Sequence, residues 1–220
     1  WKPFLLGPMF KAHGWNTSPF VVYPKKGRNM WRDVERRAKK YGLAFNRPDP
    51  SDPRDFPAHS VLAARIALVG LDESWGKQFC RNVYVAQFAN GEDVSDPVTL
   101  TRLAKSAGAE GGIIARATTP DNKFRLRTQT EDAFAANIYG APSFTVGEEL
   151  FWGDDRLEDA LDWAFKINNP VMYVAFHAKP LATNRIPPYV GAAISYIRAY
   201  AWHRPLLPPL VSRRFNGSIS

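Results

Sequence analysis

The chain has 220 residues, of which 45% are hydrophobic and 13% aromatic, so it can fill a globular core and is not intrinsically disordered. Its single cysteine, Cys80, excludes a disulfide framework and a Cys-x-x-Cys redox site. The formal net charge is +8, but residues 168–220 hold six basic and no acidic residues, whereas the first 167 residues hold 23 basic and 21 acidic ones. We therefore expect no nucleic-acid partner for the body of the protein.

Membrane and metal-binding functions are not indicated either. No apolar run approaches the roughly 20 residues of a membrane-spanning helix, and no signal peptide is recognisable. We therefore expect a cytoplasmic protein without a membrane partner. The four histidines lack the spacing of metal ligands, so no metal site is predicted. Cys80 falls within a helical pattern beside Phe79, which favours a small buried residue.

The first helical signal lies near the N-terminus. A helix is predicted over about 31–40, in which Asp33 can form an i,i+3 or i,i+4 ion pair with Arg36 or Arg37. Residues 46–57 contain four prolines and are therefore predicted to be a loop.

Residues 58–136 repeat apolar residues at spacings of three and four, which predicts several α-helices. The two clearest stripes are Leu62, Ile66 and Val69, and Trp75, Phe79, Val83 and Ala86. Asp96 before Pro97 is typical of an N-cap followed by proline at the first helical position, and Pro120 opens a further helix. We interpret the aromatic stripe as core and not as a cofactor site.

Residues 140–157 hold the most informative pattern. The β-branched and aromatic runs 143–146 and 150–152 are separated by residues 147–149, which predicts a hairpin with a three-residue connection. Pro142 stands just before the first strand. A cis bond there would leave backbone groups able to pair with an extended peptide, and an ordinary trans turn is the competing interpretation.

A capped helix is predicted after the hairpin. Asp154 or Asp155 can be its N-cap, and Glu158 stands three residues after Asp155, as in a capping box. The apolar stripe of this helix is Leu157, Ala160, Leu161, Ala164 and Phe165. Asp155 at a helix start offers a carboxylate for an ammonium group beside free N–H groups for a carboxylate, and a cap without a ligand is the plainer alternative.

Three segments in this region carry a family resemblance. Gly140-Ala-Pro-Ser-Phe144, Glu149-Leu-Phe-Trp-Gly153 and Asp155-Arg-Leu157, in this order and spacing, resemble the end of 2-hydroxychromene-2-carboxylate isomerases. Those enzymes belong with the kappa-class glutathione transferases, in the DsbA-like branch of the thioredoxin superfamily. The resemblance covers about residues 1–165.

The resemblance implies an α/β fold of DsbA-like type over residues 1–167. A thioredoxin-like sheet from about 1–24 and 137–167 would carry an all-helical insertion over about 30–136, with the ligand in the cleft between them. Residues 1–7 are similar to the end of the second strand of such a sheet, so the first strand is missing from the chain.

No catalytic residue is assigned within the chain. The glutathione-activating serine of the family belongs to a Ser-Pro-Tyr-type motif in the first βα unit, and is expected upstream of Trp1. Thr17-Ser-Pro-Phe20 looks similar to that motif but is expected to fall in a loop.

By resemblance the cofactor is glutathione, and five residues are assigned to it. These are Asn16, Ala141, Pro142, Asp154 and Asp155. The Ala141 backbone would pair with the cysteinyl part and the aspartates with the γ-glutamyl group, Asp155 more securely because a carboxylate at 154 would repel the glutamyl carboxylate. Lys11 is assigned to an anionic group of the substrate, with a solvated surface lysine as the alternative. Trp15 is an insertion in the family's Lys-x-x-Gly-Asn pattern, just before Asn16.

Two classes of function follow from these residues. The resemblance implies a glutathione-dependent isomerase of aromatic catabolism, in which a thiolate adds to 2-hydroxychromene-2-carboxylate, a carbon–carbon bond rotates and the thiol leaves. Its partners would be glutathione and a small aromatic or electrophilic substrate, with a homodimer left open. The alternative is a non-catalytic or truncated thioredoxin-like module that binds glutathione or a peptide.

Residues 168–220 fall outside the resemblance. They are basic and contain seven of the 18 prolines. Three interpretations stay open: a disordered tail, a fused or out-of-frame extension, or a strand over 170–176 that fills the vacant first-strand position.

Overall fold

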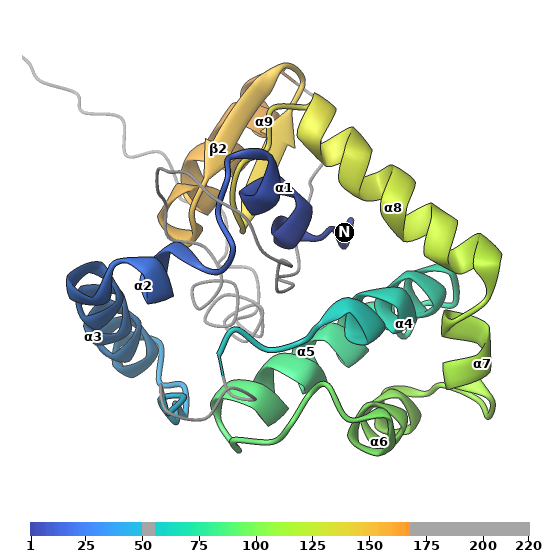
Figure 1. Ribbon diagram of the computed structural model, residues 1–220. Helices are drawn as coiled ribbons and strands as arrows, with labels where there is room; N and C mark the ends of the chain where they lie inside the picture. Colours follow the sequence, from blue (N-terminus) through green and yellow to red (C-terminus); the bar gives the residue numbers. More distant parts are fainter. Residues whose placement is uncertain (50–55, 168–220) are drawn as a thin grey trace, which may run out of the picture.

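The computed structural model describes residues 1–49 and 56–167, so the three interpretations of residues 168–220 lie outside the described residues. The elements in chain order are α1 (Leu6–Ala12), α2 (Pro19–Val22), α3 (Pro24–Lys40), α4 (Val61–Asp72), α5 (Gly76–Phe88), α6 (Pro97–Ala107), α7 (Ile113–Ala117), α8 (Pro120–Ala135), β1 (Ser143–Val146), β2 (Glu149–Trp152), the 3₁₀ turn η1 (Asp154–Arg156) and α9 (Leu157–Ile167). Helices α4 to α7 gather at one end of the molecule, the hairpin and α9 lie at the other, and α8 runs between them (Figure 1).

The N-terminal segment departs from the predicted strand end at Leu6 and Gly7, which already belong to α1, whereas Leu5 lies in an isolated β-bridge. Residues 1–4 lie outside helices and strands, and α1 already begins at Leu6. The Leu5 N–H donates to Thr130 Oγ1 at 3.2 Å, and the Gln129 side chain donates to the Pro3 carbonyl. Side chains of α8 thus supply hydrogen-bond partners to this segment in addition to the β-bridge at Leu5.

Two helices also start where a loop was predicted. Ser18 begins the short helix α2, with Pro19 in its first turn and the Phe20 N–H donating to Ser18 Oγ at 3.3 Å. Helix α3 then begins at Pro24, seven residues before the predicted start. Proline suits a first helical turn because the N–H it lacks would have no partner there. Asp33 does pair with Arg36, at 3.1 Å.

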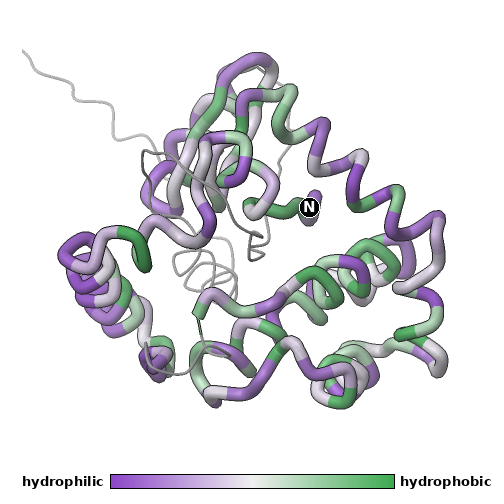
Figure 2. Tube along the Cα trace, in the orientation of Figure 1, coloured by the Kyte–Doolittle hydropathy of each residue, from purple (hydrophilic) through white to green (hydrophobic). Residues whose placement is uncertain are grey.

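The helices predicted between 58 and 136 are confirmed, and they enclose the main core. All positions of the two predicted stripes except Leu62 are buried, and Leu62 packs against the core. Helix α4 is hydrophobic along most of its length (Figure 2). Asp96 caps α6 by accepting from Val98 N and Thr99 N, as predicted. Cys80 is fully buried, and this burial raises the pKa of its thiol.

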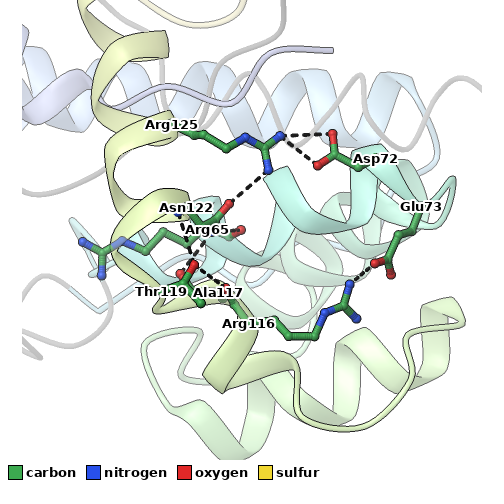
Figure 3. Close-up of polar contacts among 8 residues, drawn as sticks. All are labelled: Arg65, Asp72, Glu73, Arg116, Ala117, Thr119, Asn122 and Arg125. Atoms are coloured by element: carbon green, nitrogen blue, oxygen red, sulfur yellow. Dashed lines mark hydrogen bonds and ion pairs between the residues drawn. The ribbon is translucent and has the colours of Figure 1, made fainter.

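Polar contacts fix α7 and α8 against α4 (Figure 3). Asn122 is buried, and its amide donates to the backbone carbonyls of Arg65 and Ala117, each at 3.0 Å. An ion pair of 2.8 Å joins Arg125 to Asp72 at the surface. Because the buried Asn122 amide has hydrogen-bond partners on both α4 and α7, its burial costs little free energy and sets the position of α8.

The end of the described chain is a strand–strand–helix unit, as predicted. Strands β1 and β2 are antiparallel and form the sheet of the described residues, with Val146 opposite Glu149. The connection is thus the two residues Gly147 and Glu148, not three, and Gly147 supplies the positive φ of 62° that such a tight turn requires.

Helix α9 packs on this hairpin with a narrower face than predicted. Leu157 and Ala160 are buried against Phe144 and Val146, whereas Leu161 and Phe165 are exposed. The prediction is wrong for these two side chains, because a two-stranded hairpin covers only the part of the helix surface that faces it.

Candidate functional site

Two hydrogen bonds hold the loop before β1, one within the loop and one from Gly153, which follows β2. The Ala141–Pro142 peptide bond is cis, as predicted. Gly153 N donates to the Pro142 carbonyl at 3.0 Å, and Ser143 Oγ donates to the Gly140 carbonyl at 2.8 Å. Ala141 is fully buried, and its backbone makes no hydrogen bond to any residue that the structure describes.

The segment after α1 belongs to the same part of the molecule as this loop. Trp15 and Ala141 are members of one hydrophobic cluster, in which the ring centroids of Trp15 and Phe10 are 5.7 Å apart. Trp15 N donates to the Phe10 carbonyl at 2.8 Å, so the chain folds back over α1. Asn16 follows at the surface. The structure therefore places the predicted residues Asn16, Ala141 and Pro142 on adjoining segments.

Trp15 contributes a polar atom that sequence reasoning did not assign. Its side chain is buried, and the indole Nε1 has no hydrogen-bond partner among the described residues. A buried donor without a partner costs free energy, so such a group is a candidate for contact with a ligand. The insertion of Trp15 before Asn16 was the available signal.

The Asp154 carboxylate forms an ion pair within the protein. Its side chain is 1% exposed and accepts from Arg37 Nε at 3.0 Å and from the terminal guanidinium nitrogen of Arg37. Burial is the largest single influence and lowers the pKa of Arg37, but the hydrogen bond to Asp154 and the nearby negative charge together outweigh it and raise that pKa above its ordinary value. The carboxylate assigned to glutathione thus joins η1 to α3.

Sequence reasoning considered Arg37 only as a possible partner of Asp33 and missed its pairing with Asp154, although a signal for it existed. Helical phase puts Arg36 on the outer face of α3, whereas Arg37 adjoins the buried face that contains Val34 and Ala38. An arginine at such a border extends across the surface toward a neighbouring element. The sequence alone could not name that element, because Asp154 lies 117 residues away.

Asp155, in contrast, is an accessible carboxylate. Its side chain is 58% exposed and lies 3.8 Å from Arg156. The predicted N-cap role of the two aspartates is wrong, because both lie inside the first turn and Gly153 precedes it. Gly153 has φ of 109°, a conformation that an aspartate adopts only with strain.

Lys11 lies apart from these contacts. It occupies the last turn of α1 with its side chain exposed, and no described residue pairs with its ammonium group. Over residues 1–49 and 56–167 the structure holds no cluster of His, Cys, Asp or Glu suited to a metal ion, and no helix long and apolar enough to cross a bilayer.

The fold is that of a DsbA-like thioredoxin domain, mostly helical with a small antiparallel two-stranded sheet among the described residues. The model of the DSBA-like thioredoxin domain matches residues 1–162, and the chain belongs to that family. Its predicted place in the DsbA-like branch is thereby confirmed.

Two proteins illustrate the relationship. The 2-hydroxychromene-2-carboxylate isomerase of Sphingobium xenophagum is 26% identical over 148 residues, which cover 67% of this chain and 72% of that protein. A solved structure of a 2-hydroxychromene-2-carboxylate isomerase shares the fold with a TM-score of 0.56 at 19% identity, over 66% of this chain and 70% of its own.

Proposed function

We propose that this protein is a glutathione-dependent isomerase of the 2-hydroxychromene-2-carboxylate type. The observation that carries the proposal is the 26% identity to the Sphingobium isomerase, which extends over two thirds of the chain and is matched by a common fold. The substrate class is a small aromatic compound with an unsaturated carbon that a thiol can attack.

The residues around Pro142, Asn16 and η1 fit glutathione in part. Asp155 is exposed and can bind the γ-glutamyl ammonium group, and Asn16 can hydrogen-bond the tripeptide. The backbone of Ala141, which bonds to no described residue, can pair with the cysteinyl amide. Asp154 does not fit as a ligand, because Arg37 already occupies its carboxylate. Its contribution is to hold η1, and with it Asp155, in position.

Glutathione supplies a thiolate, whose reversible addition permits rotation about a carbon–carbon double bond. The task of the protein is then to orient the tripeptide and to hold the substrate, for which Lys11 offers a cation to a carboxylate. A hydroxyl donor that lowers the thiol pKa is not among the groups assigned above. Ser18 does not fit this role, because it is buried and accepts from Phe20 N.

Because no residue assigned above activates the thiol, a second candidate function is also supported. A domain that orients glutathione without a thiol-activating hydroxyl would bind the tripeptide, or a peptide of similar backbone, without isomerising a substrate. The two candidates share the binding residues and differ in turnover.

Calorimetric titration with glutathione, together with an absorbance assay on 2-hydroxychromene-2-carboxylate, separates them. Asp155→Asn should weaken glutathione binding about tenfold, since one ionic hydrogen bond is worth roughly 1.5 kcal/mol. The matched control is Glu148→Gln, which removes an exposed carboxylate in the β1–β2 turn and should bind glutathione like the wild type. Binding with turnover supports the isomerase and binding without turnover the second candidate. No binding by the wild-type protein contradicts both.

A further inference from the structure

Helix α3 concentrates positive charge on an otherwise acidic body. Its 17 residues include eight basic and two acidic ones, whereas the other residues up to 167 include 15 basic and 19 acidic ones. The small net charge of residues 1–167 is therefore the sum of a strongly basic helix and an acidic remainder. A field of one sign that is confined to one helix indicates a surface for an anionic partner.

The cations form one row on the solvent side of α3. Lys25, Arg28, Arg32, Arg36 and Lys39 follow one another at spacings of three, four, four and three, and all five are exposed. With 3.6 residues per turn they span an arc of about 80° and a length of about 21 Å. The opposite side of the helix is buried in the core. The row thus faces outward along nearly the whole helix.

Little of this charge is neutralised within the described residues. Arg32 pairs with Glu35 at 2.7 Å and Arg36 with Asp33 at 3.1 Å, but the two arginine side chains stay 71% and 58% exposed. Exposed pairs of this kind are weak and leave the arginines available to other anions. Lys25, Arg28 and Lys39 have no ion-pair partner among the described residues.

An exposed aliphatic pair adjoins the start of this row. Val21 and Val22 on α2 are 50% and 39% exposed, and α2 contacts α3 directly. Figures 1 and 2 show α2 and α3 together at an outer corner of the molecule, with a hydrophobic segment next to the hydrophilic helix.

The chemistry of this face favours a lipid surface over nucleic acid. Single-stranded nucleic acids are bound by cations interleaved with exposed aromatic rings. The aromatic ring of α3, Trp31, is instead buried against Phe56, with ring centroids 4.9 Å apart. A straight row of cations beside two aliphatic side chains matches the plane of anionic headgroups above an apolar layer.

We propose that the α2–α3 face, defined as Val21, Val22 and the five cations of the row, binds anionic lipid membranes peripherally. The cations contact the headgroup phosphates and carboxylates, and the two valines enter the interface. This interaction is independent of the proposed isomerase activity, because it uses none of the residues assigned to glutathione.

The test is co-sedimentation of the full chain with phosphatidylcholine vesicles that contain or lack phosphatidylserine. The wild-type protein should bind only the vesicles with phosphatidylserine, and raised salt should release it. The α3 variant Lys25→Glu/Arg28→Glu/Lys39→Glu should bind at least about tenfold more weakly, because each cation near an anionic surface contributes on the order of 1 kcal/mol. This variant keeps both arginine pairs of the row.

The matched control is Lys77→Glu/Lys105→Glu/Lys123→Glu, which makes the same change of net charge at exposed positions of α5, α6 and α8. It should bind vesicles within about twofold of the wild type. Circular dichroism verifies that each variant is folded. If the α3 variant does not fold, Val21→Ser/Val22→Ser replaces it, and should weaken vesicle binding without changing the charge.

Two results would overturn the proposal. Equal vesicle binding by the α3 variant and its control would assign the binding to basic residues elsewhere, such as those in 168–220. Tight binding of duplex DNA, with phosphatidylserine vesicles bound no better than phosphatidylcholine ones, would make the face a nucleic-acid surface instead.

Discussion

Arg37 and Asp154 form the ion pair that joins α3 to η1, in the closing strand–strand–helix unit. Arg37 Nε lies 3.0 Å from Asp154 Oδ2, and the same guanidinium donates to Tyr41 Oη at 3.1 Å. The carboxylate is buried, so it serves the fold and leaves Asp155 as the exposed acid beside it.

Removal of this arginine should be strongly destabilising. Arg37→Ala leaves the buried Asp154 carboxylate without a counter-charge, and we expect it to lower the free energy of unfolding by about 3 kcal/mol. Urea unfolding followed by circular dichroism measures the change. Arg36→Ala removes an exposed pair on the same helix and should cost only about 0.5 kcal/mol.

The double variant Arg37→Ala/Asp154→Asn tests whether the pair itself is responsible. It should be more stable than Arg37→Ala alone, because the neutral amide costs less to bury than an unpaired carboxylate. If Arg37→Ala and Arg36→Ala are equally stable, Arg37 does not anchor η1.

The indole of Trp15 provides a test of the glutathione site. Trp15→Phe removes the buried Nε1–H but keeps an aromatic ring in the cluster with Ala141. If the free donor contacts glutathione, calorimetry should show about fivefold weaker binding, which corresponds to one hydrogen bond of about 1 kcal/mol. Stability should change little, since the lost donor has no partner in the described protein.

Trp75→Phe is the control for this substitution. The Trp75 indole donates to Glu73 at 3.0 Å between α4 and α5, so its loss should reduce stability and leave glutathione affinity unchanged. Equal affinities of the wild type and Trp15→Phe would place the Trp15 indole outside the ligand site.

Local sequence patterns predicted most of the helices and the hairpin, whereas the fold class was predicted from the family resemblance. Asp96 caps α6 as predicted because a cap depends on residues three positions away. The helical stripes and the hairpin follow in the same way from neighbours in the chain. Residues 1–7 were predicted to be the end of a strand, but α1 begins within them at Leu6, and the segment before it bonds to Gln129 and Thr130 on a distant helix. Extended apolar residues look alike whether a strand or side chains satisfy their backbone.

The site was harder to predict than the fold. Asp154 and Asp155 are adjacent and chemically identical, yet one is buried and the other exposed. The difference arises from Arg37, whose approach depends on the packing of α3, and from Gly153, whose positive φ places both aspartates inside the turn. Arg37 is distant in the sequence, and Gly153, although adjacent, does not reveal its φ by its identity alone.

Cys80 should be inert in the folded protein. It is fully buried, and burial raises the pKa of its thiol, so little of the reactive thiolate exists near neutral pH. We expect a thiol reagent such as Ellman's reagent to modify Cys80 at least about 100-fold more slowly in buffer than in urea. Rapid modification without denaturant would show that α5 opens readily, contrary to its place in the core.

Asp96 should make the stability of the protein depend on pH. The carboxylate accepts from Thr99 N at 2.8 Å, Thr99 Oγ1 at 2.9 Å and Val98 N at 3.2 Å. These bonds, with Thr99 first, lower the pKa of Asp96 below its ordinary value. A folded-state pKa below that of the unfolded chain means that the unfolded chain binds the proton first as the pH falls. The contribution of Asp96 is therefore complete above the ordinary aspartate pKa of about 4 and is lost below it.

The variant Asp96→Asn isolates this contribution, because its amide can still cap α6 but does not titrate. Unfolding in urea at a series of pH values should show the wild type more stable than Asp96→Asn near neutral pH, and this advantage should shrink as the pH falls through the acid range. Thr99→Val removes the hydroxyl donor and should reduce the pH-dependent part of the difference, because one of three bonds to the ionised form is gone. Parallel pH profiles for the wild type and Asp96→Asn would mean that the cap stabilises the charged and neutral carboxyl groups equally, and the assigned direction of the pKa shift would then be wrong.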